Sequence, residues 1–190
     1  KQDYNKAKEY YERAIELGNS NAICNLGFLY DKGKGVKQDY NKAKEYYERA
    51  IELGNSNAIC NLGFLYDKGK GVKQDYNKAK EYYERAIELG NSDAMVNLGA
   101  LYANGQGVKQ DYNKAKEYYE RAAELGNSKA MFSLGNHYKE GQGVEQDYNK
   151  AKEYYERAIE LGDSDAMFSL GLLYANGQGV KQDYNKTKEY

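Results

Sequence analysis

The chain has 190 residues, and its 28 lysine and arginine residues are balanced by 29 aspartate and glutamate residues, for a formal charge of −1. This balance leaves no general excess of cations to hold a polyanion, so it argues against a nucleic-acid-binding protein. No apolar run approaches the roughly 18 residues that a membrane-spanning helix needs.

A segment of 36 residues repeats along the chain, with the first two copies identical, the next three edited and the sixth cut short. A fixed period of this length is typical of solenoid proteins, in which each copy completes its core by stacking on its neighbours. We therefore expect a single array over residues 1–190. The copies occupy residues 1–36, 37–72, 73–108, 109–144, 145–180 and 181–190.

The sequence begins without methionine inside the repeat pattern and ends inside a copy, so we expect a piece of a longer protein. No signal-like segment opens it. A cytoplasmic location is the first expectation. A secreted or periplasmic location is the alternative, because the true N-terminus is expected to lie outside this sequence.

The first helix of the second copy is expected between an N-cap at Asp39 and a C′ glycine at Gly54. On a wheel of 100° per residue, lysine and glutamate share one face, which is the pattern of an amphipathic helix and not of a strand. We call this kind of helix B. Its apolar face carries Tyr40, Ala43, Tyr47, Ala50 and Ile51.

The second helix of the same copy, called A, is expected from a cap at Ser56 to about Lys68. Gly69 and Gly71 supply the positive φ angles that end it, and Val72 returns to the core. Gly63, on the core face, lets a neighbouring helix approach closely. The core face of helix A carries Ala58, Ile59, Leu62, Gly63 and Tyr66.

Tyrosine and cysteine both occur at repeated positions. The 22 tyrosines recur at the same places in each copy, which indicates core packing and not a stacking platform for bases or sugars. Cys24 and Cys60 lie one period apart, about 10 Å in stacked helix pairs and beyond the roughly 7 Å Cα separation that a disulfide allows. We expect free, half-buried thiols.

The pattern A-x-x-x-L-G-x-x-Y-x-x-G-x-G-V from Ala58 to Val72, followed by D-Y-x-K-A-x-x-Y-Y-x-x-A from Asp75, resembles the Sel1-like repeat family. The resemblance spans the whole chain, and its most specific part is the G-x-G-V loop after the L-G-x-x-Y helix. Tetratricopeptide units, which are related, lack this loop.

The resemblance implies an all-α fold of antiparallel helix pairs wound into a right-handed superhelix, with A helices lining its concave surface. It also implies an adaptor or scaffold for protein complexes. A cysteine-rich branch of the family has been credited with penicillin binding. Those members carry paired cysteines within each copy, and this chain has none of those pairs.

The copies differ mainly on the face of helix A opposite its core, while helix B barely changes. A scaffold needs fixed core positions, whereas residues that touch a partner must differ along the groove. Neutral drift after duplication is the alternative, although drift should also mark the back of helix B. The predicted partner-binding residues are Asn21, Cys24, Asn25, Phe28, Asp31, Lys32, Asn57, Cys60, Asn61, Phe64, Asp67, Lys68, Asp93, Val96, Asn97, Ala100, Asn104, Lys129, Phe132, Asn136, Lys139, Glu140, Asp165, Phe168, Leu172 and Asn176.

These residues predict a groove with an apolar middle and charges of both signs along its edges, which is typical of a partner site. A line of asparagine and serine beside it could bond a ligand's backbone. The expected ligand is a peptide segment, extended or helical, anchored by apolar side chains. The line consists of Asn25, Asn61, Asn97, Ser133 and Ser169.

Catalytic, metal and cofactor sites are not expected. His137 is the only histidine, and no nucleophile is aligned with it. In the D-x-D of Asp163 and Asp165, Ala166 follows where a calcium loop would continue with oxygen ligands, so a helix cap is expected. The G-x-G pairs lack the Lys-Ser/Thr of a phosphate-binding loop.

Two other functions stay open at this point. An RNA-binding helical repeat would need a basic groove and strong salt dependence, and a hydrolase like the cysteine-rich branch would need motifs that this sequence lacks. Both ends of the array present uncapped apolar faces, so we also expect end-to-end association of copies of the chain.

Overall fold

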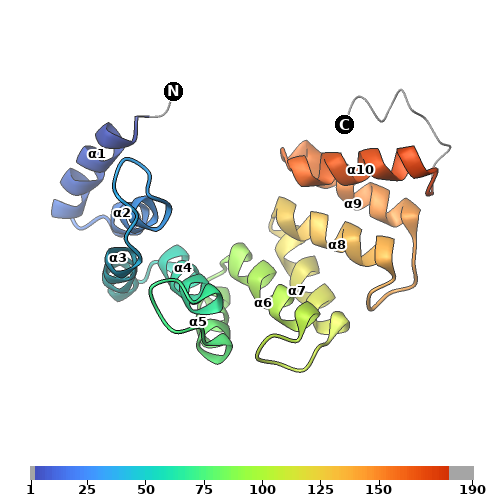
Figure 1. Ribbon diagram of the computed structural model, residues 1–190, viewed down its shortest axis with the longest axis horizontal. Coiled ribbons are helices and arrows are strands. Elements are labelled where there is room, and N and C mark those ends of the chain that lie inside the picture. The colour runs from blue at the N-terminus through green and yellow to red at the C-terminus, as the bar shows by residue number, and fades with distance from the viewer. Residues whose placement is uncertain (1–2, 180–190) are drawn as a thin grey trace. The chain divides into compact units, whose positions relative to one another are not determined.

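The structure, a computed structural model, describes residues 3–179, and within them it contains ten α-helices and no strand (Figure 1). Each described helix has 13 residues, too short and too polar to cross a bilayer. The odd-numbered helices are B helices and the even-numbered ones are A helices. They are α1 Tyr4–Glu16, α2 Ser20–Lys32, α3 Tyr40–Glu52, α4 Ser56–Lys68, α5 Tyr76–Glu88, α6 Ser92–Asn104, α7 Tyr112–Glu124, α8 Ser128–Glu140, α9 Tyr148–Glu160 and α10 Ser164–Asn176.

Backbone contacts divide the chain into two compact units, Lys1–Ala94 and Met95–Tyr190, which we call the N-terminal half and the C-terminal half. In the first, α2 packs between α1 and α3, and α4 packs between α3 and α5. In the second, α8 packs between α7 and α9, and α10 lies against α9 (Figure 1). Consecutive helices therefore pack as the repeat pattern predicts.

Side-chain caps set the beginning of each helix type. Asp39 accepts hydrogen bonds from the backbone N–H groups of Asn41 and Lys42, which confirms the predicted cap of helix B. The predicted cap of helix A at Ser56 is wrong by one residue. The amide oxygen of Asn55 accepts from the backbone N–H of Ala58, and Ser56 already lies in the helix. Asn and Ser are comparable caps, so spacing alone could not separate them.

The predicted core faces are largely confirmed in the N-terminal half. Ala43, Tyr47 and Ala50 of α3 are fully buried and contact a cluster of buried residues from α2 and α4. Tyr40 and Tyr66, predicted on core faces, are only half-buried at its margin. Tyrosine fits such a margin because its ring packs while its hydroxyl reaches water.

Each A helix from α2 to α8 contacts the following B helix at one glycine. A Cβ atom added at Gly63 of α4 would lie 2.9 Å from Cε1 of Tyr83 in α5, so the tyrosine ring rests on the glycine backbone. The same pairing recurs within the helix pairs of the other copies, which confirms that this glycine permits close packing. The other pairs are Gly27 with Tyr47, Gly99 with Tyr119 and Gly135 with Tyr155.

The G-x-G-V loop folds back on the end of helix A. Gly69 and Gly71 have φ angles of 64° and 67°, as predicted, and the backbone N–H of Asp75 donates to the carbonyl of Tyr66 at 2.9 Å. The side chain of Gln74 donates to the carbonyl of Asp67 at 2.7 Å. This glutamine ties the loop to the last turn of the helix.

Candidate functional site

Two phenylalanine rings on the A helices of the N-terminal half are partly open to solvent. Phe28 of α2 and Phe64 of α4, both predicted to lie in the open groove, are half-buried. The ammonium group of Lys32 lies between them, 5.5 Å from the centre of the first ring and 5.4 Å from the second. An ammonium this close to an aromatic face is attracted by the ring's electrons. The two rings therefore belong to one continuous surface.

Three more lysines surround the same rings. Lys34 lies 5.4 Å from the centre of the Phe28 ring. Lys70 and Lys68 lie 5.2 Å and 5.7 Å from the centre of the Phe64 ring. Lys34 and Lys70 are loop residues that were absent from the predicted site. The signal that could have found them is the lysine between the two loop glycines, which only the first two copies contain.

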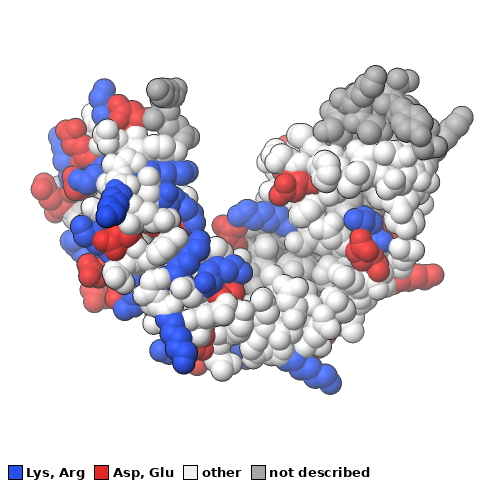
Figure 2. Space-filling model, viewed as in Figure 1, with Lys and Arg blue, Asp and Glu red and all other residues white. Residues whose placement is uncertain are grey.

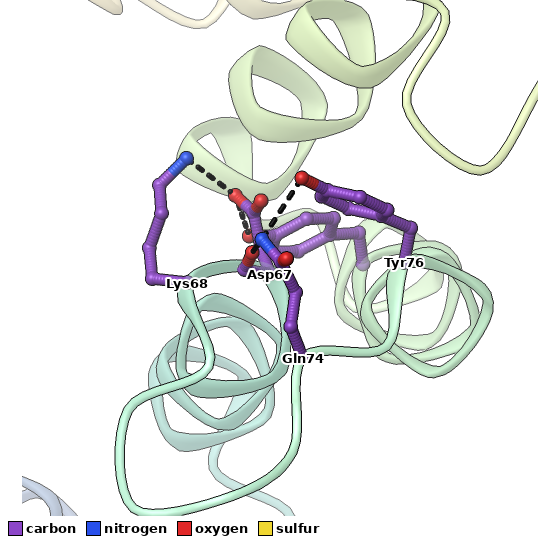
Figure 3. A network of polar contacts seen from close by, with 5 residues as sticks. Asp67, Lys68, Gln74 and Tyr76 are labelled. Atoms are coloured by element: carbon purple, nitrogen blue, oxygen red, sulfur yellow. Dashed lines mark hydrogen bonds and ion pairs between the residues drawn. The ribbon is translucent and has the colours of Figure 1, made fainter.

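Asp31 and Asp67 were predicted at the open edge of the groove, and this is wrong because both are buried. The Asp67 side chain points back into the helix layer, where one oxygen pairs with the ammonium of Lys68 at 3.0 Å (Figure 3). The hydroxyl of Tyr83 donates to that oxygen at 3.4 Å. Burial and, next, the negative charge of Asp67 raise the pKa of Tyr83. Asp67 is therefore part of the packing between α4 and α5.

Cys24 and Cys60 were predicted along the middle of the groove, and this too is wrong because both are buried. Neither of them forms a disulfide. Their A helices touch: the amide of Asn61 on α4 donates to the sulfur of Cys24 on α2 at 3.6 Å. Burial raises the pKa of the Cys24 thiol to about 11. Helix A thus packs against a second A helix as well as against B helices. Its buried surface is therefore wider than the core face that the helical wheel predicts.

Several polar side chains that were predicted to contact a partner form hydrogen bonds within the fold instead. Asn55, the cap of α4, donates to the side-chain oxygen of Asn21 at 2.8 Å, and Asn91 donates likewise to Asn57 at 2.7 Å. In the C-terminal half the hydroxyl of Ser133 donates to the carbonyl of Lys129 at 2.8 Å. Of the predicted polar line, Ser133 and Asn61, which donates to Cys24, are thus used within the fold, while Asn21 and Asn57 are other predicted partner-binding residues that bond between copies.

The A-helix face of the C-terminal half is more apolar. Phe132 of α8 is half-buried, and its ring centre lies 5.9 Å from that of Tyr155. The hydroxyl of Tyr155 donates to the side-chain oxygen of Asn136 at 2.6 Å. On α10, Phe168 and Leu172 are 66% and 42% exposed. Phe168 and Leu172 are therefore open apolar side chains on α10.

Exposure sorts the predicted partner-binding residues into three groups. Thirteen are exposed: Asn21, Asn25, Lys32, Asn57, Lys68, Asp93, Asn104, Lys129, Glu140, Asp165, Phe168, Leu172 and Asn176. Nine are half-buried: Phe28, Asn61, Phe64, Val96, Asn97, Ala100, Phe132, Asn136 and Lys139. The four buried ones are Cys24, Asp31, Cys60 and Asp67.

His137 is a packing residue in this structure. It is 3% exposed and lies edge-on between the rings of Tyr112 and Tyr119, at 5.8 Å and 5.3 Å between ring centres. Its Nδ1 atom has no hydrogen-bond partner among the described residues. Burial lowers the pKa of its imidazole. Asp163 caps α10, as predicted, by accepting from the backbone N–H of Ala166.

Within residues 3–179 no group of three or more histidine, cysteine, aspartate or glutamate side chains is placed to hold a metal ion.

Three comparisons relate the chain to known proteins. The model of the Sel1 repeat matches residues 1–19, 20–55, 56–91, 92–127, 128–163 and 164–190. Each complete match begins with an A helix and ends just after the following B helix. None of the curated protein sequences matches.

Solved structures similar to this chain include other Sel1 repeat proteins. One from Oxalobacter formigenes is 36% identical, with a TM-score of 0.85 over 99% of this chain and 77% of that one. The protective antigen c5321 of uropathogenic Escherichia coli, described as displaying an SLR fold, is 34% identical, with a TM-score of 0.77. The match covers 96% of this chain and only 40% of that one.

A third similar structure is the immunity protein Pa5087 of Pseudomonas aeruginosa, 28% identical, with a TM-score of 0.75 over 96% of this chain and 70% of that one. The repeat matches run without a gap from residue 1 to residue 190 and follow the helix pairs of the structure. The chain therefore belongs to the Sel1 repeat family.

Proposed function

We propose that the chain is a non-catalytic scaffold that binds a peptide segment of a partner protein on the face formed by its A helices. Sel1 repeat proteins are generally scaffolds for protein interactions. The peptide and its place on the A helices are our proposal. The observation that carries it is the partial exposure of Phe28 and Phe64, large apolar side chains on successive A helices.

The pattern of change among copies supports the same face. Ala100, Asn136 and Leu172 replace Phe64 in later copies, while the glycine and tyrosine that join helix A to helix B are kept. The fixed residues preserve stacking, and the position of Phe64, which varies, is half-buried or exposed in the later copies. Exposed aromatic side chains are the usual anchors of protein interfaces.

The alternatives receive less support. An RNA-binding repeat needs a continuous cationic track, and the positions of Lys32 and Lys68 hold Asn104, Glu140 and Asn176 in later copies. A hydrolase needs a base that reaches its substrate. His137 is enclosed by two tyrosine rings instead.

A selection from an unbiased library of short displayed peptides tests the proposal. The affinity of the selected peptides is measured for the unaltered chain and for two variants. Phe64→Glu places a charge on the A-helix face, and Asn41→Glu places the same charge at an exposed position of α3. We expect Phe64→Glu to weaken binding at least about tenfold and Asn41→Glu to leave it unchanged. Equal binding to both variants, with helicity intact, would overturn the proposal.

End-to-end association stays a prediction from the sequence. Ala7 and Tyr11 of α1 are only half-buried, although the matching Ala43 and Tyr47 of α3 are fully buried. This uncovered face could take an A helix of a second copy. Sedimentation velocity over a wide range of concentrations checks it: the mean mass should rise with concentration, and a constant monomer mass would contradict it.

A further inference from the structure

Lysine side chains gather around the phenylalanine rings of the N-terminal half and not at the matching places in later copies. The first two copies read DKGKGV at the end of helix A, at residues 31–36 and 67–72. Later copies read ANGQGV or KEGQGV, so glutamine takes the place of Lys34 and Lys70. On the face shown in Figure 2, Lys and Arg are dense over the N-terminal half and sparse over the C-terminal half.

Two of these lysines carry charge that the fold does not neutralise. Lys32 and Lys68 each pair with a buried carboxylate, that of Asp31 at 2.7 Å and of Asp67 at 3.0 Å. Lys34 and Lys70 form no ion pair with any residue between 3 and 179; their ammonium groups lie over aromatic rings. Four ammonium groups against two carboxylates leave the surface positive beside an apolar centre.

We propose that this surface binds an acidic polypeptide segment, whose carboxylates pair with the lysines while its apolar side chains rest on the two rings. The proposal rests on the proposed function, because it names the class of peptide for one part of the same A-helix face. We call the surface the Phe–Lys patch. It consists of Phe28, Lys32, Lys34, Phe64, Lys68 and Lys70.

The repeat spacing suits an extended peptide. Because Lys32 lies 5.5 Å from one ring centre and 5.4 Å from the other, the two centres are at most about 11 Å apart, a distance that an extended chain covers in no more than about three residues. The first two copies therefore present the same contacts within about three residues of each other along the ligand. A segment with acidic residues about three apart, and apolar residues between them, matches both the charges and the rings.

A polypeptide fits this patch better than a nucleic acid does. A phosphate backbone carries a negative charge at every nucleotide and binds tightly through many lysine and arginine contacts. Of the four lysines in the patch, only Lys34 and Lys70 offer charge without a carboxylate partner, and the matching loop residues of later copies are Gln106, Gln142 and Gln178. An acidic peptide has only a few carboxylates, and each of them can pair with one lysine of the first two copies.

The test uses labelled synthetic peptides of about twelve residues and the whole 190-residue chain. One peptide repeats Glu-Leu-Ser, a second has glutamine in place of glutamate, and an oligoadenylate of similar length serves as the nucleic acid. The test variant gives both loops the sequence found at 103–106, through Asp→Ala at 31 and 67, Lys→Asn at 32 and 68, and Lys→Gln at 34 and 70. A third copy already folds with that loop, so the repeat fold tolerates it.

The control variant carries Lys44→Gln and Lys80→Gln, which change the net charge equally on the backs of α3 and α5. We expect the acidic peptide to bind the unaltered chain and the control alike, and to bind the loop variant about tenfold less tightly. The glutamine peptide should bind the unaltered chain about tenfold less tightly too. Raising the salt concentration from about 50 mM to about 500 mM should weaken the binding of the acidic peptide and leave that of the glutamine peptide unchanged.

Three results would overturn the proposal: equal binding of the acidic and glutamine peptides, no effect of the loop exchange, or tighter binding of the oligoadenylate. If Phe64→Glu weakens both peptides equally and the loop exchange weakens neither, the A-helix face binds peptides without preferring acidic ones. If neither synthetic peptide binds, the acidic preference fails, and the library selection alone decides the proposed function.

Discussion

Gly63 lies directly beneath the ring of Tyr83, so close that a Cβ atom at Gly63 would be 2.9 Å from Cε1 of the ring. This contact joins α4 to α5, and an equivalent contact joins α2 to α3, α6 to α7 and α8 to α9. The hydroxyl of the same tyrosine reaches the buried carboxylate of Asp67. One glycine and one tyrosine per copy thus set the distance between the two helices that hold the exposed face in place.

Substituting Gly63 with alanine is expected to destabilise the protein by about 1–3 kcal/mol, because the added methyl group overpacks the contact with Tyr83. In an open helix the same change is stabilising by about 0.5–1 kcal/mol, so the sign of the effect is informative. Urea unfolding measures it. Asn25→Ala, at an exposed position of α2, is the control and should change stability by less than about 0.5 kcal/mol. A Gly63→Ala protein more stable than the original would contradict the packing described.

Substituting Gln74 with alanine is expected to lower the free energy of unfolding by about 1 kcal/mol. The side chain donates to the carbonyl of Asp67 at 2.7 Å and to the hydroxyl of Tyr76 at 2.8 Å (Figure 3). Its neighbour Lys73 is exposed, and Lys73→Ala serves as the control. If both variants unfold at the same urea concentration as the original chain, the glutamine does not hold the loop.

Substituting His137 with leucine should flatten the dependence of stability on pH between about 7 and 5. Burial between the rings of Tyr112 and Tyr119 lowers the pKa of the folded imidazole below its ordinary 6.5. The unfolded chain therefore binds a proton more readily, and stability is lost as the pH falls through and below 6.5. Leucine, which the other complete copies carry at this position, removes that loss. Chemical unfolding at several pH values compares the two proteins, and parallel profiles would contradict the burial of a neutral histidine.

Both cysteine thiols should resist alkylation in the native protein. Cys24 is buried and its pKa is raised to about 11, and Cys60 occupies the matching buried site on α4. The thiolate is the reactive form, so modification near pH 7.5 should be on the order of a hundredfold slower than that of an exposed thiol. Iodoacetamide labelling followed by mass spectrometry measures the rate, and unfolding in urea should restore full reactivity. Rapid labelling of the folded chain would contradict this burial and indicate that the cysteines lie on the open face.

The helices could be predicted from sequence because each depends on local features. Asp39 caps a B helix, and Gly69 ends an A helix in the left-handed conformation, as their residue types indicate. The close approach at Gly63 was also predictable, since glycine on an otherwise apolar face is typical of tight helix packing. These predictions needed no knowledge of how successive copies stack.

The extent of the open face could not be predicted in the same way. A helical wheel assigns one buried and one open side, but α2 and α4 also touch each other, as the bond from Asn61 to Cys24 shows. Asp67 is buried although aspartate is polar, because Lys68 and Tyr83 partly offset its charge and fill the space around it. Such burial depends on contacts between copies, which the sequence of one copy does not contain.

Photo-crosslinking of a bound peptide tests most directly the claim that the A helices hold the partner. A peptide selected from the library is synthesised with a benzophenone side chain, crosslinked to the whole chain and mapped by mass spectrometry. We predict crosslinks to α2, α4 and the loops 31–36 and 67–72, and to the A helices of the C-terminal half for peptides that bind there. Crosslinks confined to the exposed backs of α3, α5, α7 and α9 would contradict the account.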